Sequence, residues 1–110
     1  MIVLLTGHRG RLGSVIGEHL GSLGHEVRGF DLVEGGDILD AAAVKQAARG
    51  ATAIVHVAGM AGDRPASPEA IMAANVLGTW HVLLAAEAAG VRRVVYLSSG
   101  KPRWSSSTGR

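Results

Sequence analysis

Three glycines spaced three residues apart have the clearest chemical potential in this sequence. Gly7, Gly10 and Gly13 lie in the segment TGHRGRLG, directly after the apolar run MIVLL at the start of the chain. Glycine allows tight turns and close backbone approaches that a side chain would block. A loop of this kind, leading from a strand into a helix, offers free N–H groups and partial positive charge to a phosphate. The stretch therefore favours phosphate binding, and the alternative is a turn glycine followed by glycines that only pack a helix.

An acidic residue and a basic residue bear on which phosphate compound would bind. Asp31 follows the apolar segment 26–30, and an acid at such a place accepts hydrogen bonds from an adenosine ribose and repels a 2′-phosphate. By itself, Asp31 could equally be an aspartate that ends a strand in a turn. Arg9 indicates the opposite preference, because a basic side chain in the loop can reach a 2′-phosphate, unless it is simply a solvated cation. These residues favour NAD and leave NADP open.

The elements that must position these residues alternate between strand and helix. Gly24, Gly50 and Gly90 stand where helix-ending glycines belong, and Ser67 followed by Pro68 is typical of a helix start. Apolar periodicity predicts strands at 2–5, 26–30, around 37–38, 52–59 and 91–99, and helices at 12–23, 41–50 and 67–89. This alternation predicts an α/β fold with a parallel sheet, right-handed crossovers and helices on both faces.

Composition limits the classes of function. The chain has 110 residues, 47% of them apolar and 18% charged, which fits one globular domain. The net charge of +2 is not gathered along one face, so no nucleic-acid partner is expected. The apolar stretch 70–90 contains Asn75, His81 and Glu87, so we expect a buried helix and no membrane partner. The absence of cysteine favours the cytoplasm.

Three further observations concern single side chains. His56 lies in an apolar strand and is expected to be a core histidine with satisfied hydrogen bonds, and Trp80, on a helix rich in alanine and leucine, is expected to be a packing residue. No two of the five histidines have the i, i+4 spacing of helical zinc ligands, so no metal site is expected. The last strand, which contains VVYLS, would leave an exposed sheet edge and favour self-association as a homo-oligomer.

The glycine loop resembles the pattern T-G-x-x-G-x-x-G of the short-chain dehydrogenase/reductase superfamily, in particular its extended branch of NAD-dependent epimerases and dehydratases. GDILD at 36–40, IVHVAG at 54–59 and the segment 75–99, which begins NVLGT, resemble further family motifs in the same order. The resemblance covers residues 2–99. It implies a Rossmann-type doubly wound parallel sheet of about five strands in the order 3-2-1-4-5, truncated before the sixth strand and the substrate domain. Residues 1–100 would form an incomplete NAD(P)-binding domain, followed by an irregular basic, serine-rich tail at 101–110.

The resemblance also implies a role for individual residues. The glycine loop would hold the pyrophosphate, Asp31 the ribose, and the GDILD segment the adenine, while the IVHVAG segment would lie beside the cofactor. The residues expected at the cofactor are Gly7, Arg9, Gly10, Arg11, Leu12, Gly13, Asp31, Asp37, Ile38, Val57, Ala58, Gly59 and Asn75.

Two polar residues match the catalytic side of the family. Ser99 matches the serine or threonine that hydrogen-bonds the reacting oxygen, and Asn75 matches an asparagine on the helix beside the active site. Taken from the residues alone, Ser99 could simply end a strand, and Asn75 could stabilise a kink in the helix. The family also uses a Tyr-x-x-x-Lys pair, and Tyr96, Lys45 and Lys101 do not have that spacing.

The expected function is therefore that of the NAD(P)-binding part of an epimerase/dehydratase-type oxidoreductase, acting on nucleotide sugars or related carbonyl and hydroxyl substrates. The small-molecule substrate itself is not indicated. Whether the chain is an enzyme stays open, because the Tyr-x-x-x-Lys pair is absent from it. The alternatives are a non-catalytic NAD(P)-binding sensor module and an inactive fragment.

Overall fold

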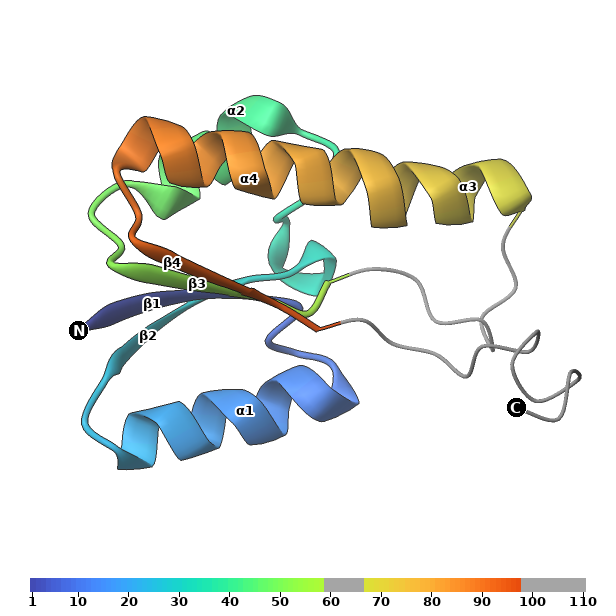
Figure 1. Cartoon of the computed structure of the whole chain (residues 1–110). Helices are drawn as coiled ribbons and strands as arrows, with labels where there is room; N and C mark the ends of the chain where they lie inside the picture. Colours follow the sequence, from blue (N-terminus) through green and yellow to red (C-terminus); the bar gives the residue numbers. More distant parts are fainter. Residues whose placement is uncertain (59–66, 98–110) are drawn as a thin grey trace, which may run out of the picture.

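The computed structural model describes residues 1–58 and 67–97, and there the chain forms a parallel sheet with helices on both faces (Figure 1). The elements in chain order are β1 (Ile2–Thr6), α1 (Arg11–Ser22), β2 (Glu26–Phe30), the 3-10 helix η1 (Leu32–Glu34), α2 (Ala41–Ala48), β3 (Ala53–His56), α3 (Pro68–Met72), the π-helical segment η2 (Ala73–Leu77), α4 (Gly78–Ala89) and β4 (Arg93–Tyr96). The strands pair in the order β2-β1-β3-β4, all parallel. Helix α1 covers one face, and α2 and α4 cover the other (Figure 1). The predicted α/β class is confirmed.

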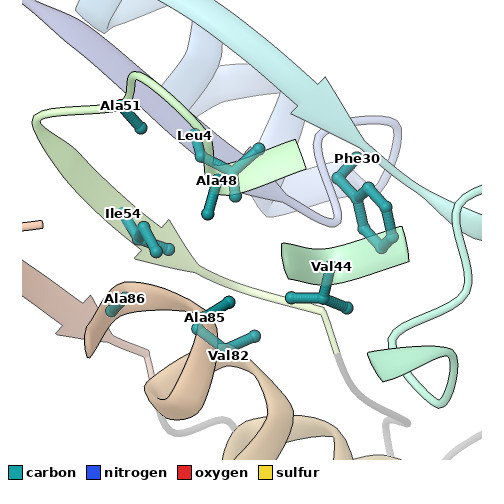
Figure 2. Close-up of a cluster of buried hydrophobic side chains, with 9 residues drawn as sticks. All are labelled: Leu4, Phe30, Val44, Ala48, Ala51, Ile54, Val82, Ala85 and Ala86. Atoms are coloured by element: carbon teal, nitrogen blue, oxygen red, sulfur yellow. The ribbon is translucent and has the colours of Figure 1, made fainter. Parts of the chain in front are cut away.

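The main core lies between the sheet and the pair of helices α2 and α4 (Figure 2). Strands β1, β2 and β3 each contribute one large apolar side chain, whereas the helices contribute only alanine and valine, which lets them pack close to the sheet. Burying each valine, leucine or isoleucine stabilises the fold by about 1.5–3 kcal/mol. The cluster consists of Leu4, Phe30, Val44, Ala48, Ala51, Ile54, Val82, Ala85 and Ala86.

Helix ends follow the signals seen in the sequence. Gly24, Gly50 and Gly90 all have positive φ, at +91°, +80° and +71°, just beyond the ends of α1, α2 and α4. Ser67 accepts a hydrogen bond at its side chain from the backbone N–H of Ala70, at 3.1 Å, and Pro68 occupies the first position of α3. Capping chemistry local to each end is therefore enough to set these boundaries.

The strand expected around residues 37–38 does not form, so the described chain has four strands rather than five. Asp37 accepts a hydrogen bond at Oδ1 from the N–H of Leu39, and its carbonyl accepts one from the N–H of Asp40. Asp40 in turn caps α2 through its side chain. These local bonds compete with sheet pairing and hold the segment in a turn. The strand order otherwise agrees with the prediction once its first member is removed.

The helix expected at 67–89 is one helical stretch, Pro68–Ala89, interrupted by the π-helical segment η2. Its length of 22 residues and mean hydropathy of 1.3 would suffice for a membrane span, but Val82 and Ala86 belong to the core beneath α4, as in a globular domain. The expectation for Trp80 was wrong, because its side chain is 56% exposed. At about 100° per residue, Trp80 is turned well away from the face that carries Val82 and Ala86.

Candidate functional site

A cavity of about 590 Å³ lies beyond the carboxyl ends of β1, β2 and β3. Strand β1 pairs with β2 on one side and β3 on the other, so the chain reverses its direction of travel across the sheet at this point. Ligands of open α/β sheets bind at such a switch point. The cavity is lined by Gly7, Arg9, Gly10, Arg11, Leu12, Gly13, Phe30, Asp31, Leu32, Val33, Gly36, Asp37, Ile38, Leu39, Val57, Ala58, Ala70, Ala73 and Ala74.

The glycine loop joins β1 to α1 along the floor of this cavity. Gly7 has a φ of +75°, and a Cβ added there would lie 2.8 Å from the backbone N of Ala58. A Cβ on Gly13 would overlap the carbonyl oxygen of Gly7. Glycine at both positions is therefore what lets the loop turn sharply and lets α1 start against it.

The N-terminus of α1 faces the cavity without a side chain that neutralises it. Gly10 is the N-cap and makes no side-chain cap, and the first turn contains no acidic residue. The first N–H groups of an α-helix have no acceptor inside the helix, and they carry the positive end of its dipole. Arg11, Leu12 and Gly13 bring those groups to the cavity wall, which makes this end of the cavity suited to an anionic group.

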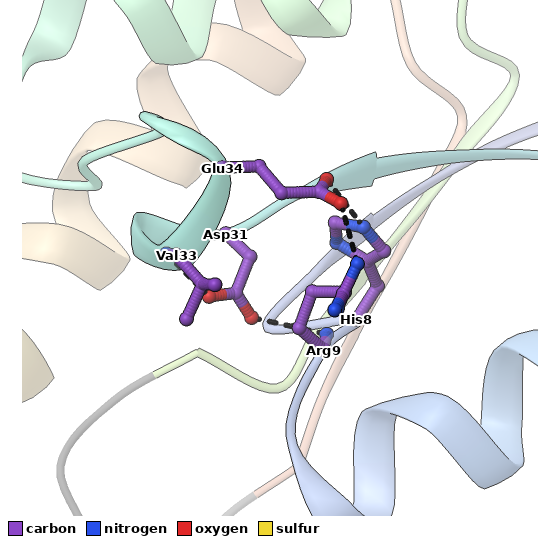
Figure 3. Close-up of polar contacts among 5 residues, drawn as sticks. All are labelled: His8, Arg9, Asp31, Val33 and Glu34. Atoms are coloured by element: carbon purple, nitrogen blue, oxygen red, sulfur yellow. Dashed lines mark hydrogen bonds and ion pairs between the residues drawn. The ribbon is translucent and has the colours of Figure 1, made fainter.

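Asp31 lies opposite the loop, at the end of β2. Its Oδ2 accepts a hydrogen bond from the backbone N–H of Arg9 at 3.0 Å, and its Oδ1 accepts one from the N–H of Val33 at 3.0 Å (Figure 3). Two backbone donors thus hold the carboxylate in place from different segments. Each oxygen keeps capacity for a further donor, so the side chain can still accept hydrogen bonds from hydroxyl groups in the cavity.

Glu34 joins the two basic side chains of the loop, and sequence reasoning missed it. Its Oε2 lies 2.9 Å from Nη1 of Arg9, and its Oε1 lies 2.9 Å from Nε2 of His8 (Figure 3). About half of the Arg9 and Glu34 side chains is exposed, at 55% and 47%. The only signal in the sequence was an acid three residues after Asp31, which without the fold is an ordinary turn residue.

A buried polar network supports the loop from below, and here Thr6 was also missed. The Thr6 hydroxyl oxygen accepts hydrogen bonds from the N–H groups of Val57 and Ala58 and lies 2.6 Å from Nδ1 of His56. On the other side of the ring, Nε2 lies 3.2 Å from the hydroxyl oxygen of Thr79. Both Thr6 and His56 are fully buried.

The direction of these bonds fixes the state of His56. Thr79 donates its hydroxyl proton to the carbonyl of Asn75, so its oxygen accepts from Nε2–H of His56, and Nδ1 accepts from Thr6. Burial lowers the pKa of His56 from 6.5 to about 4, so the ring is neutral near pH 7. The expectation of a satisfied core histidine is confirmed.

Most of the residues predicted at the cofactor lie together around this 590 Å³ cavity. Those that line it are Gly7, Arg9, Gly10, Arg11, Leu12, Gly13, Asp31, Asp37, Ile38, Val57 and Ala58. Asn75 does not line it, although the neighbouring Ala74 does. Gly59 and Ser99 lie outside the described residues. In residues 1–58 and 67–97, no three histidine, aspartate or glutamate side chains gather as a metal site would require.

The apolar part of the wall was not foreseen from the sequence. Phe30, Leu32 and Val33 line it from the end of β2 and from η1, and Ala70 and Ala73 line it from the helical stretch above. These residues give the cavity an apolar wall near the carboxylates of Asp31 and Asp37, suited to an apolar group. In the sequence they carried no signal beyond their hydrophobicity.

Comparison with known proteins decides which family has this arrangement. The family model described as "NAD dependent epimerase/dehydratase family" matches residues 3–102. This chain belongs to that family. The expected short-chain dehydrogenase/reductase resemblance, and the Rossmann-type fold that it implied, are thereby confirmed.

Individual members of the epimerase/dehydratase family give the scale of the match. Uronate dehydrogenase from Pseudomonas syringae pv. tomato is 36% identical over 109 residues, which cover 88% of this chain and 39% of that protein. A crystal structure of a short-chain dehydrogenase/reductase superfamily protein from Agrobacterium tumefaciens with bound NAD is 39% identical, with a TM-score of 0.78, over 91% of this chain and 33% of that one. UDP-glucose 4-epimerase from Thermus thermophilus in complex with NAD is 30% identical, with a TM-score of 0.81, over 90% and 38%. The chain thus spans about 39% of the length of that uronate dehydrogenase.

Proposed function

We propose that this chain binds NAD in the 590 Å³ cavity and is the dinucleotide-binding part of an oxidoreductase that acts on a sugar hydroxyl or carbonyl group. One observation carries the proposal: the helix N-terminus, the glycine loop and the Asp31 carboxylate all face the same cavity. That combination offers an anion site and a hydroxyl acceptor within one space, as a dinucleotide requires.

The residues fit the parts of NAD in order along the cavity. The N–H groups at the start of α1 would hold the pyrophosphate, and the Asp31 carboxylate would accept the adenosine ribose hydroxyls. The slot between η1 and the 37–39 turn, with Val33 and Ile38, would take the adenine. Val57 and Ala58 continue from β3 toward the nicotinamide half. When bound, NAD supplies the hydride acceptor or donor.

The arrangement supports NAD over NADP. Asp31 is held by two backbone donors in the part of the cavity where a ribose would lie, and a fixed carboxylate there repels a 2′-phosphate. Both the Agrobacterium tumefaciens and the Thermus thermophilus structures contain NAD. We therefore propose NADP only as a weaker ligand.

The substrate class rests on the relatives. One is named a uronate dehydrogenase and another a UDP-glucose 4-epimerase, so a sugar acid or a nucleotide sugar is the class we propose. Ser99 remains our proposal for the residue that hydrogen-bonds the reacting oxygen, and Asn75 for a residue near it. The second candidate is a non-catalytic NAD(P)-binding module, favoured by the lack of a Tyr-x-x-x-Lys pair in these 110 residues.

Calorimetric titration of the 110-residue chain with NAD and then NADP tests the proposal. We expect saturable heat with NAD, and about tenfold weaker binding by an Asp31→Ala variant, because a charge-assisted hydrogen bond to the ribose is lost. Glu18→Ala, on the exposed surface of α1, is the control and should bind as the wild type does. An absence of heat with both cofactors would contradict the NAD site.

A second measurement looks for oxidoreductase activity in the 110-residue chain itself. The chain is mixed with NAD and with a panel of uronic acids and UDP-sugars, and the near-ultraviolet absorbance of NADH is followed. Binding with NADH formation supports an oxidoreductase. Binding without it, for every sugar of the panel, shows that these 110 residues do not oxidise the sugars by themselves, as the lack of a Tyr-x-x-x-Lys pair in them predicts for both candidates.

A further inference from the structure

Near the proposed ribose end of the cavity, Glu34 contacts a lining residue, Arg9, but does not line the cavity itself. Glu34 stands behind Arg9, and only Arg9 of the two reaches the cavity wall. Arg9 is the side chain that could pair with a 2′-phosphate, and so its availability decides how well NADP would bind. The question is whether its guanidinium is free to do so.

Both oxygens of the Glu34 carboxylate are occupied by the loop. Oε2 accepts from Nη1 of Arg9 and Oε1 pairs with Nε2 of His8, each at 2.9 Å (Figure 3). The backbone N–H of the same Arg9 donates to Asp31. One residue of the loop is therefore tied to two carboxylates at once, by its backbone and by its guanidinium.

His8 keeps Glu34 in this position. The His8 ring lies against the backbone of Gly29 in β2, where an added Cβ would overlap the ring atoms. Its side chain is 20% exposed, and the ring nitrogen that faces Glu34 is Nε2, 2.9 Å from Oε1. The Glu34 carboxylate thus lies between the His8 ring, which packs against Gly29, and the Arg9 guanidinium.

We propose that Glu34 is a specificity-determining residue that disfavours NADP by neutralising Arg9. The inference rests on the proposed NAD site. A 2′-phosphate carries up to two negative charges, and to pair with Arg9 it would have to share the guanidinium with the Glu34 carboxylate, which already neutralises it, while lying beside Asp31. NAD has a hydroxyl at that place, so it meets Asp31 without disturbing the Arg9–Glu34 pair.

The test is the affinity for NAD and for NADP when Glu34 is replaced by an uncharged residue. In Glu34→Gln, Arg9 loses its partner and one repelling charge disappears, so we expect NADP to bind about tenfold tighter, a size set by the partial exposure of the pair. NAD should change by no more than about threefold, because its ribose contact is to Asp31. Calorimetric dissociation constants for NAD and NADP are the readout, and added salt should weaken the new NADP binding.

Two controls isolate the mechanism. Glu18→Gln, on the exposed surface of α1, makes the same change of net charge and should leave both affinities as in the wild type. In the double variant Glu34→Gln/Arg9→Gln, the gain for NADP should vanish, since the freed guanidinium is gone. Arg9→Gln alone should alter NADP binding by no more than about twofold, because Arg9 is already engaged.

The outcomes distinguish this inference from the NAD site on which it rests. If Glu34→Gln binds NAD normally and NADP no better than the wild type does, the role of Glu34 is refuted and the NAD site stands. The role of Glu34 is also refuted if the wild-type chain binds NADP as tightly as NAD, or if Arg9→Gln loses NADP binding. Absence of binding by either cofactor overturns both. Circular dichroism of Glu34→Gln shows whether it folds, and if it does not, Arg9→Gln decides.

Discussion

Thr6 is a fully buried hydroxyl that serves two strands. Its oxygen accepts two backbone N–H groups from the end of β3, at 3.1 Å each, and its proton is directed to His56. These bonds hold Val57 and Ala58, which line the cavity, at a fixed height above the glycine loop. A residue without contact to the proposed cofactor thus sets the shape of its site.

Replacing Thr6 by valine keeps the volume and removes the hydroxyl. We expect a loss of about 1–3 kcal/mol in the free energy of unfolding, because the N–H of Ala58 and Nδ1 of His56 lose their partner, while the N–H of Val57 keeps the carbonyl of Thr6. Urea denaturation followed by circular dichroism measures it. Thr52→Val is the matched control: its hydroxyl also bonds to β1, at the N–H and carbonyl of Ile2, but it is exposed and water can replace it. Equal losses for the two variants would contradict the role assigned to burial.

His56 makes stability depend on pH in a defined window. Its pKa in the folded chain is about 4, against 6.5 when unfolded, and it contacts Thr6, Thr79 and the ring of Tyr96. Above about pH 6.5 the ring is neutral in both states and contributes no pH dependence. Below that, the unfolded chain takes up a proton that the folded chain does not, so stability falls until about pH 4, by roughly 3 kcal/mol in all.

A His56→Gln variant isolates this contribution. The loss of stability between about pH 7 and about pH 5, measured by urea denaturation, should be smaller in the variant than in the wild type by about 2 kcal/mol. Taking the difference between the two proteins cancels the titration of their common groups. Identical slopes would mean that burial does not suppress the protonation of His56.

At the scale of elements, the sequence predicted helix boundaries wherever a short segment of the chain determines them. Ser67 followed by Pro68 predicted a helix start, and Gly90 predicted its end, because caps are made by neighbours in the chain. The extra strand at 37–38 was wrong because the apolar pair Ile38–Leu39 between two aspartates resembled a short strand, whereas both carboxylates cap local backbone. The π-helical segment η2 was not predicted as such; its one distinguishing residue, Asn75, suggested only a kink.

The sequence did not predict which side chains of different elements contact one another. Glu34 and Arg9 are 25 residues apart, and their pairing depends on β2 lying beside β1 with η1 directly above the loop. Thr6 and His56 meet because β1 and β3 pair in register at those residues. The glycine spacing revealed a phosphate loop, but no local pattern could show which side chains support it.

The junction of the loop with α1 yields a test at this scale. In Gly13→Ala, the new methyl group would overlap the carbonyl oxygen of Gly7, a backbone atom that cannot rotate aside. We expect the unfolding free energy to fall by about 1–3 kcal/mol and the NAD affinity to fall with it, because the start of α1 must move away from the loop. Denaturation and calorimetry report the two effects.

Gly21→Ala is the matched control on the same helix. A Cβ there meets nothing within 4 Å, so the substitution should instead stabilise the chain by about 0.5–1 kcal/mol through helix propensity. NAD binding should not change. A Gly13→Ala variant that behaves like Gly21→Ala would show that the close approach of loop and helix is not needed.

At the scale of the whole molecule, the two edges of the described sheet differ. Strand β2 carries two charged residues, Glu26 and Arg28, whereas β4 carries one, Arg93, at its start; charged side chains on an edge strand discourage pairing with another chain. Strand β4 pairs with β3 on one side, and its Val95 and Tyr96 are 43% and 50% exposed. The sequence had predicted an exposed edge at this last strand, and the sheet order places β4 there among the described strands.

That edge predicts self-association of the chain at high concentration. Sedimentation velocity from about 10 μM to about 1 mM should show a rising mean mass, since an edge strand that is apolar or aromatic after Arg93 offers unpaired backbone groups to a second copy. In Val95→Lys the association should weaken, because a charge then lies on the edge, while the circular dichroism spectrum stays that of the wild type. Val15→Lys, at a 63% exposed position on α1, adds the same charge away from the edge and should leave the association unchanged. A wild-type chain that stays a single monomeric species throughout, or is dispersed equally well by both lysines, would mean that the edge of β4 does not drive assembly.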